Sequence, residues 1–192
     1  MGENKRRMLA GDWYLPDDPE LGADARRAAG LCAAYNAPDP PPERRDALLR
    51  ELLGSVGEGV RVRPPFHCDF GRLITIGAGT FVNFGAVFLD TAPITLGADV
   101  QLGPYVQLLT PAHPLEAGRR RAGWERGLPV TLGDNVWLGG GVIVCPGVTI
   151  GENTVVGAGS VVVGDLPPGV LAVGNPARVV RTLEPSPPPS SA

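Results

Sequence analysis

An aliphatic residue returns at every sixth position through the second half of the chain. The unbroken run comprises Leu132, Leu138, Val144, Ile150, Val156 and Val162. Glycine follows most of these positions, and a small or β-branched residue stands four positions after each of the first five. A helix of 3.6 residues per turn cannot keep positions six apart on one face. The period therefore excludes an amphipathic helix and indicates short strands separated by corners.

The same period runs through the first half of the chain, with one shift of two residues at the sequence DTAPIT. Its apolar positions are Ile76, Val82 and Phe88 before the shift, and Leu96, Leu102 and Leu108 after it. Glycine suits the corners because it adopts backbone conformations that other residues disfavour. One turn of such a chain cannot bury its own apolar face, so successive turns must stack through parallel pairing. The pattern predicts a parallel β-helix, whose hand the period does not set.

Different patterns occur at the two ends of the chain. Residues 18–36 and 39–54 have the composition of helices, and the second segment begins with an acid and early prolines and ends at a glycine. The last residues are rich in proline and serine, which is typical of disorder. We therefore expect a helical N-terminal subdomain over 1–60, a β-helix over 61–183 with an inserted loop over 110–129, and a disordered tail over 184–192.

Composition and charge exclude several functions. A net charge of −3 and one short arginine run, 119–121, do not suggest a nucleic-acid-binding surface. No apolar stretch is long enough for a signal peptide or a membrane span, so we expect a cytoplasmic protein without a membrane partner. The three cysteines, Cys32, Cys68 and Cys145, form no CxxC pair, and we interpret them as packing residues rather than a zinc site or a disulfide framework.

The repeat stops for about twenty residues around a single histidine. The interruption begins LLTPAHPLEAGRRR, and it contains His113, one of only two histidines in the chain. An imidazole has an unperturbed pKa of about 6.5, so it can accept a proton at neutral pH. The break in an otherwise regular scaffold therefore makes His113 the first candidate for a catalytic residue.

Several further motifs occur together and in order: MLAGDWY, CDFG, FVNFGAVFLD, AHPL and GNPARVV. From about Met8 to Arg181 the chain resembles the hexapeptide-repeat sugar O-acetyltransferases, and more narrowly the maltose, galactoside and nodulation acetyltransferases. The resemblance implies a left-handed parallel β-helix and a homotrimer with active sites between subunits. It also implies acetyl-CoA as donor, a sugar or glycoside as acceptor, and no metal.

In that family, the histidine matching His113 is the general base that removes a proton from the acceptor hydroxyl as its oxygen attacks the thioester. Transfer is then direct, without an acyl-enzyme. The resemblance makes Asn83 a second catalytic residue, which contacts the acceptor and the transition state, although an asparagine at this position could simply cap a corner.

Carboxylates suit a sugar because each accepts hydrogen bonds from adjacent hydroxyls. By resemblance, Asp17, Asp69 and Asp90 join Asn83 in binding the acceptor, with Asp18 as the alternative to Asp17. The residues expected to bind coenzyme A are Trp137, Gly140, Ala158, Val163, Gly164, Arg178 and Arg181. The chain departs from these relatives at two places. Val163-Gly164 replaces a common Thr-Lys, and Ala112 replaces the glycine before the histidine.

Other proteins with such repeats set the alternatives. The γ-class carbonic anhydrases need three histidine ligands, and this chain has two, with His67 before the repeat. Serine acetyltransferases have a longer helical N-terminal region. Xenobiotic acetyltransferases also use a loop histidine with acetyl-CoA, but they do not account for the MLAGDWY segment. A solenoid without activity, acting as an interaction module, is the alternative from a different class. The sequence leaves the acceptor open.

Overall fold

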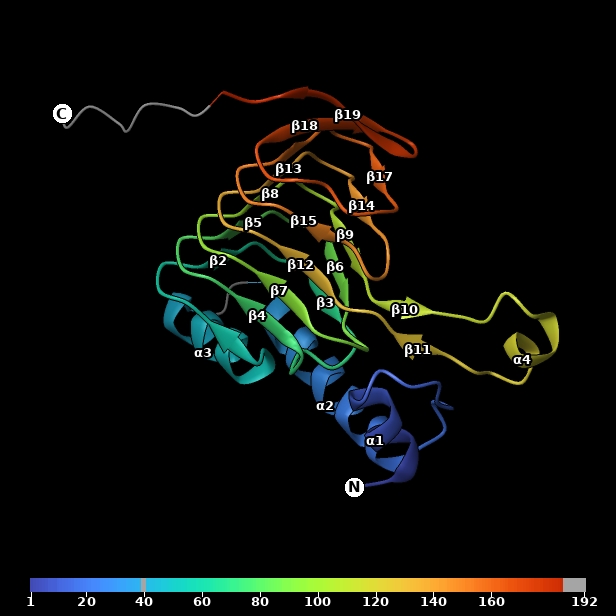
Figure 1. Ribbon diagram of the computed structural model, residues 1–192. Coiled ribbons are helices and arrows are strands. Elements are labelled where there is room, and N and C mark those ends of the chain that lie inside the picture. Colours follow the sequence, from blue (N-terminus) through green and yellow to red (C-terminus); the bar gives the residue numbers. More distant parts are fainter. Residues whose placement is uncertain (39–40, 185–192) are drawn as a thin grey trace.

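The computed structural model describes residues 1–38 and 41–184, and it shows three helices at one end of a prism of stacked coils (Figure 1). Apart from Glu184, the tail expected to be disordered lies outside the described residues. Each coil of the prism runs through three short strands that belong to three different sheets. This arrangement confirms the expected β-helix with a helical N-terminal region.

The three sheets form the three faces of the prism. The first face contains β1 (Ser55–Val56), β4 (Ile74–Ile76), β7 (Ile94–Leu96), β12 (Val130–Leu132) and β15 (Thr149–Ile150). The second contains β2 (Arg61–Val62), β5 (Phe81–Val82), β8 (Gln101–Leu102), β13 (Trp137–Leu138), β16 (Val155–Val156), β18 (Val170–Gly174) and β19 (Ala177–Thr182). The third contains β3 (Phe66–Cys68), β6 (Ala86–Leu89), β9 (Gln107–Leu109), β14 (Ile143–Val144) and β17 (Val161–Val162). All pairs within the faces are parallel except β18 with β19.

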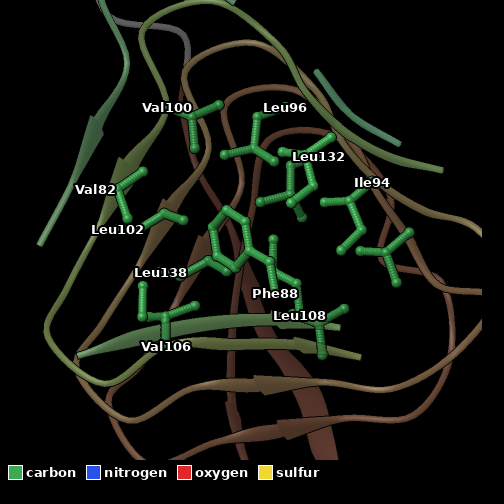
Figure 2. Close-up of a cluster of buried hydrophobic side chains, with 14 of the residues drawn as sticks. Val82, Phe88, Ile94, Leu96, Val100, Leu102, Val106, Leu108, Leu132 and Leu138 are labelled. Carbon is green, nitrogen blue, oxygen red and sulfur yellow. The ribbon is translucent and has the colours of Figure 1, made fainter. Parts of the chain in front are cut away.

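Strand register stacks the sixth-position aliphatics into ladders inside the prism. On the second face, Val82 is paired with Leu102, and Leu102 with Leu138. All three side chains are at most 1% exposed, and Figure 2 shows them around the ring of Phe88, which enters from the third face. Burial of each such side chain contributes roughly 1.5–3 kcal/mol. These ladders are why the period of six specifies the fold.

The two-residue shift at DTAPIT widens one corner of the coil. Both ends of β7, Ile94 and Leu96, point inward and are buried, so the strand that follows the shift carries two inward residues. The corner before it is closed by polar contacts between buried residues. Thr110 Oγ1 lies 3.1 Å from Thr91 Oγ1 and accepts a hydrogen bond from the Ala92 N–H at 3.0 Å.

The helical region comprises α1 (Glu3–Leu9), α2 (Pro19–Asn36) and α3 (Pro42–Leu52). The helix α1 was not predicted from the sequence; it is short and charged, and it buries only Met8. The first coil also begins earlier than expected, since β1 starts at Ser55 and pairs with β4. His67, expected to precede the repeat, is in β3 of this coil. No helix within residues 1–38 and 41–184 has the length and apolarity needed to cross a membrane.

Candidate active site

Two edges of the prism carry the predicted site residues. We call the edge between the second and third faces the asparagine edge, because Asn83 lies there in the corner between β5 and β6. We call the edge between the third and first faces the histidine edge. The inserted loop leaves this edge after β9 and returns to β12, and Figure 1 shows it projecting from the prism beside α1.

The loop is held by a short antiparallel pair, β10 (Pro111–Ala112) with β11 (Arg126–Gly127), and its tip contains α4 (Ala117–Arg121). His113 follows β10 directly. Its side chain is 53% exposed, and its Nδ1 lies 3.3 Å from the carbonyl oxygen of Trp124. A carbonyl oxygen only accepts hydrogen bonds, so this contact favours the tautomer with the proton on Nδ1. Nε2 then has a free lone pair, as a general base requires.

Glu125 is a further residue beside His113, and it was not predicted from the sequence. Its Oε2 lies 4.0 Å from His113 Nε2, and its Oε1 accepts a hydrogen bond from the Tyr14 hydroxyl. Tyr14 is 1% exposed, and burial together with the nearby Glu125 raises the pKa of Tyr14, so its hydroxyl stays a donor. The contact between Tyr14 and Glu125 arises because the backbone of residue 14 pairs with that of residue 125. No motif or spacing in the sequence predicts this pairing.

Arginine–tryptophan stacking fixes the N-terminal segment against the loop. The guanidinium of Arg126 lies 4.9 Å from the ring centroid of Trp13, and that of Arg119 lies 5.1 Å from the same ring. Arg119 also stacks on Trp124 at 5.5 Å. Such cation–π contacts are worth roughly 0.5–2 kcal/mol each, depending on their exposure. The segment before Asp17 is thereby held beside the loop that carries His113.

Asp69 lies at the histidine edge directly after β3. Burial raises the pKa of Asp69 to about 6, and the neighbouring carboxylates of Asp90 and Glu125 add to the effect. Asp69 is partly exposed and therefore able to meet a ligand. Asp69 thus lies near Glu125, which in turn lies beside His113.

Asp90 is fully buried, and the expectation that it hydrogen-bonds the sugar needs correction. Its Oδ1 accepts hydrogen bonds from the N–H groups of Asp69 at 3.1 Å and Phe70 at 2.8 Å. Its Oδ2 accepts from the N–H of Leu73 at 3.3 Å. A side chain with no exposed surface and both oxygens bound to backbone is not placed to meet a ligand. Asp90 instead fixes the corner that presents Asp69.

Replacing Asp90 should therefore affect stability. We expect Asp90→Ala to lower the free energy of unfolding by about 3–5 kcal/mol, because it leaves buried N–H groups without an acceptor. Urea denaturation measures the loss. The exposed Asp17 supplies the control, since Asp17→Ala should change stability by no more than about 0.5 kcal/mol. Equal stability of the two variants would contradict this role.

The structure distinguishes the two candidate acids at the start of α2. Asp18 is the N-cap of the helix, and its carboxylate accepts hydrogen bonds from the N–H of Glu20 at 2.9 Å and of Lys5 at 3.2 Å. These backbone hydrogen bonds, that from Glu20 above all, lower the pKa of Asp18, which is only 7% exposed. Asp17 is exposed. Of the two, Asp17 remains available to an acceptor.

On the asparagine edge, two hydrogen bonds orient the amide of Asn83. Its Oδ1 accepts from the N–H of Phe84 at 2.9 Å and from Arg63 Nη1 at 3.2 Å. The oxygen is therefore turned toward the protein, and the Nδ2 hydrogens remain as donors. Arg63 itself stacks over the ring of Phe84 at 5.1 Å, which supports this arrangement.

Higher on the same edge, the corners of successive coils present nearly bare backbone. Gly140 and Ala158 occupy neighbouring corners, where the N–H of Gly159 donates to the Gly140 carbonyl oxygen at 2.9 Å. A Cβ on Gly141 or Gly159, in the same two corners, would meet no atom within 4 Å, so open space lies beside the backbone there. The edge can thus accept an extended ligand close to its backbone.

The other residues expected to bind the donor lie apart from this edge. Trp137 projects from the second face and is 54% exposed, whereas Val163, 55% exposed, and Gly164 lie high on the histidine edge. Arg178 and Arg181 are exposed on β19. Among residues 1–38 and 41–184, no group of three or more His, Cys, Asp or Glu side chains is placed to hold a metal.

A single chain does not bring Asn83 and His113 together. The third face separates the two edges, and the four residues of β6 that cross it, Ala86–Leu89, correspond to roughly 13 Å at about 3.3 Å per residue. The asparagine edge thus carries Asn83 with the donor-site corners of Gly140 and Ala158. The histidine edge carries His113 with Val163 and Gly164.

Comparison with known families gives two matches along the chain. The maltose acetyltransferase hexapeptide capping motif matches residues 7–57, and the bacterial transferase hexapeptide family, in six repeats, matches residues 129–164. The first match covers the helical region and the start of the first coil. The second covers the two coils that follow the inserted loop.

Several known proteins, including the following three, are similar over nearly the whole chain. Nodulation protein L of Rhizobium meliloti (strain 1021) is 49% identical over 91% of this chain and 96% of its own length. The crystal structure of a maltose O-acetyltransferase from Clostridium difficile 630 is 44% identical, with a TM-score of 0.93 over 95% of this chain and 98% of that one. A hexapeptide-repeat acetyltransferase from Vibrio cholerae O1 biovar eltor, solved with acetyl coenzyme A, is 41% identical. Its TM-score is 0.90 over 96% of this chain and 100% of that one.

Proposed function

The chain belongs to the maltose acetyltransferase family of hexapeptide-repeat proteins, and on that premise we propose that it transfers the acetyl group of acetyl-CoA to a hydroxyl of a sugar or glycoside. The similar Vibrio cholerae acetyltransferase was solved with acetyl coenzyme A, which supports this donor. The observation that carries the proposal is the exposed His113 imidazole, with Nδ1 on a carbonyl oxygen and Nε2 free beside partly buried acids.

The reaction follows from these positions as a direct transfer. Nε2 of His113 removes the proton from the acceptor hydroxyl as the hydroxyl oxygen attacks the thioester carbonyl carbon. Negative charge develops on the carbonyl oxygen, and Asn83 Nδ2 donates a hydrogen bond to it. The intermediate collapses by breaking the carbon–sulfur bond. The departing coenzyme A thiolate takes the proton back from the imidazolium, and His113 returns to its starting state.

His113 and Asn83 can meet only when two copies of the chain combine. We place the active site in a groove between the histidine edge of one subunit and the asparagine edge of its neighbour. A prism with three faces closes this contact into a homotrimer when each subunit uses one edge toward each neighbour. Sedimentation should then give three times the chain mass, and a fully active monomer would contradict the arrangement.

The donor lies along the upper part of the same groove. The pantetheine arm runs over the bare corners of Gly140 and Ala158, opposite Val163 and Gly164 of the neighbour, where backbone groups supply the hydrogen bonds. Trp137 borders the groove. Arg178 and Arg181, exposed on β19, pair with the coenzyme A phosphates.

The acceptor lies at the lower end of the groove, beside His113. Asp69 and Asp17 accept hydrogen bonds from its hydroxyls, while Asp90 keeps the Asp69 corner in place. Release of coenzyme A in the presence of maltose, glucose, a galactoside and a hydroxylated antibiotic tests this assignment. Turnover confined to the sugars is expected. Turnover confined to the antibiotic would instead establish a xenobiotic acetyltransferase, and no turnover with any hydroxyl acceptor would refute the function.

The raised pKa of Asp69 predicts a pH dependence of acceptor binding. Above a pH of about 6 Asp69 is ionised and accepts hydrogen bonds from hydroxyls, so the acceptor KM should fall as the pH rises from 5 to 7. Asp69→Asn should remove this change.

Ionisation of Asp69 should favour acceptor binding but lower the stability of the folded protein. The pKa of Asp69 is higher in the folded than in the unfolded protein, so protonated Asp69 favours the folded state. This contribution to the free energy of unfolding is fully present below about pH 4 and is lost as the pH rises through about 6. Asp69→Asn should therefore be more stable than the wild type at pH 7 while binding the acceptor less tightly. A variant with an unchanged KM profile would exclude Asp69 from the acceptor site.

A further inference from the structure

Two thiols meet where the helical region packs on the first coil. Cys32 is on α2 and Cys68 is the last residue of β3, and their Sγ atoms lie 3.7 Å apart. Both are free cysteines. Cys32 is 7% exposed and belongs to the main hydrophobic core, whereas Cys68 is partly exposed and packs against that core. The pair thus lies at a boundary that a small molecule can reach through Cys68.

The contact between the thiols favours ionisation of one of them. The hydrogen bond with Cys68 lowers the pKa of the Cys32 thiol, and the positive charge of Arg27 on the same helix acts in the same direction. The same contact, together with burial, raises the pKa of Cys68. One sulfur is therefore the better nucleophile, and its neighbour is a thiol in van der Waals contact with it. A reactive thiol beside a resolving thiol is the arrangement of oxidation-sensitive cysteine pairs.

We propose that Cys32 and Cys68 form an oxidation site that hydrogen peroxide converts to an intramolecular disulfide. One of the two sulfurs attacks the peroxide and becomes a sulfenic acid, with release of one water. The other sulfur then displaces the hydroxyl group from that sulfenic acid, which releases a second water and forms the sulfur–sulfur bond. Two thiols and one hydrogen peroxide thus give one disulfide and two waters, and the peroxide is reduced.

The geometry favours this product over further oxidation. A disulfide bond is about 2.05 Å long, so the two sulfurs need to approach by less than 2 Å, a small movement for two side chains already in contact. The bond would join α2 to β3 across 36 positions of sequence. Because it restricts the unfolded chain, closure should raise the melting temperature by about 5–10 °C.

Cys145 provides an internal control. It is a free, partly exposed cysteine that follows β14 in a later coil. The full chain is treated with hydrogen peroxide, alkylated, and analysed by intact-mass and peptide mass spectrometry, and its melting is followed by circular dichroism with and without reductant. We expect the loss of two hydrogens, one alkylated thiol at Cys145, a peptide pair linking Cys32 to Cys68, and a melting temperature that falls again on reduction.

Variants separate this site from general oxidation. Cys145→Ala should form the same disulfide, whereas Cys32→Ala and Cys68→Ala should form none and show no reductant-sensitive melting. The wild-type measurement decides the question even if one of these core variants fails to fold. Three alkylated thiols after peroxide treatment, a sulfinic acid at Cys32, or a disulfide that involves Cys145 would each overturn the proposal.

Discussion

His113→Ala is expected to lose about 10²–10⁴-fold in the rate of acetyl transfer, because that is the usual contribution of a positioned general base. A sugar hydroxyl attacks a thioester slowly until its proton is removed, and the free lone pair of His113 Nε2 can take that proton. The side chain is 53% exposed in a loop, so its removal should leave both the melting temperature and coenzyme A affinity close to wild type. Steady-state turnover and calorimetric titration with coenzyme A measure the two effects.

His67 supplies the matched control for this prediction. It is the other histidine of the chain, and it lies exposed on β3 within the first coil. His67→Ala should retain wild-type turnover. A His113→Ala variant that turns over as fast as the wild type, with the same acceptor, would remove the general base from the mechanism.

Asn83→Ala is expected to lower turnover about 10²–10³-fold, the usual cost of removing one donor from an oxyanion site. The structure supports a donor role, since Asn83 Oδ1 is taken by Phe84 and Arg63 and only the Nδ2 hydrogens remain for a ligand. Coenzyme A affinity should change little, because the contact strengthens as negative charge develops on the carbonyl oxygen.

Asn83→Asp distinguishes this role from that of a corner cap. An aspartate keeps an oxygen for Phe84 and Arg63 but has no Nδ2 donor. If Asn83 donates to the oxyanion, Asn83→Asp should be as impaired in turnover as Asn83→Ala. Turnover near the wild-type rate in Asn83→Asp would mean that the residue only stabilises the corner.

The period of six was enough to predict most of the solenoid, because each inward position is stacked on its equivalent in the next coil. Val82, Leu102 and Leu138 form such a ladder, and any other register would expose one of them. The start of the first coil was missed because β1 lies before the counted repeat. The short helix α1 escaped because its residues are mostly charged and it buries only Met8.

Site residues were predictable only where the residue type itself carries the chemistry. His113 stands out as a histidine in a break of the repeat. Asp90 was misplaced because a sequence does not show whether a carboxylate faces a ligand or binds the backbone N–H groups of the coil below. Glu125 was missed because its link to Tyr14 joins positions that are far apart in the chain.

The central claim is that one active site takes His113 from one subunit and Asn83 from its neighbour. The direct test combines two inactive variants, His113→Ala and Asn83→Ala, by joint refolding in equal amounts. Random assembly should restore about a quarter of wild-type turnover, since about one in four ordered neighbour pairs joins an intact His113 to an intact Asn83. Mixed trimers whose turnover does not exceed that of the separate variants would show that both residues act within one chain, which contradicts the shared site.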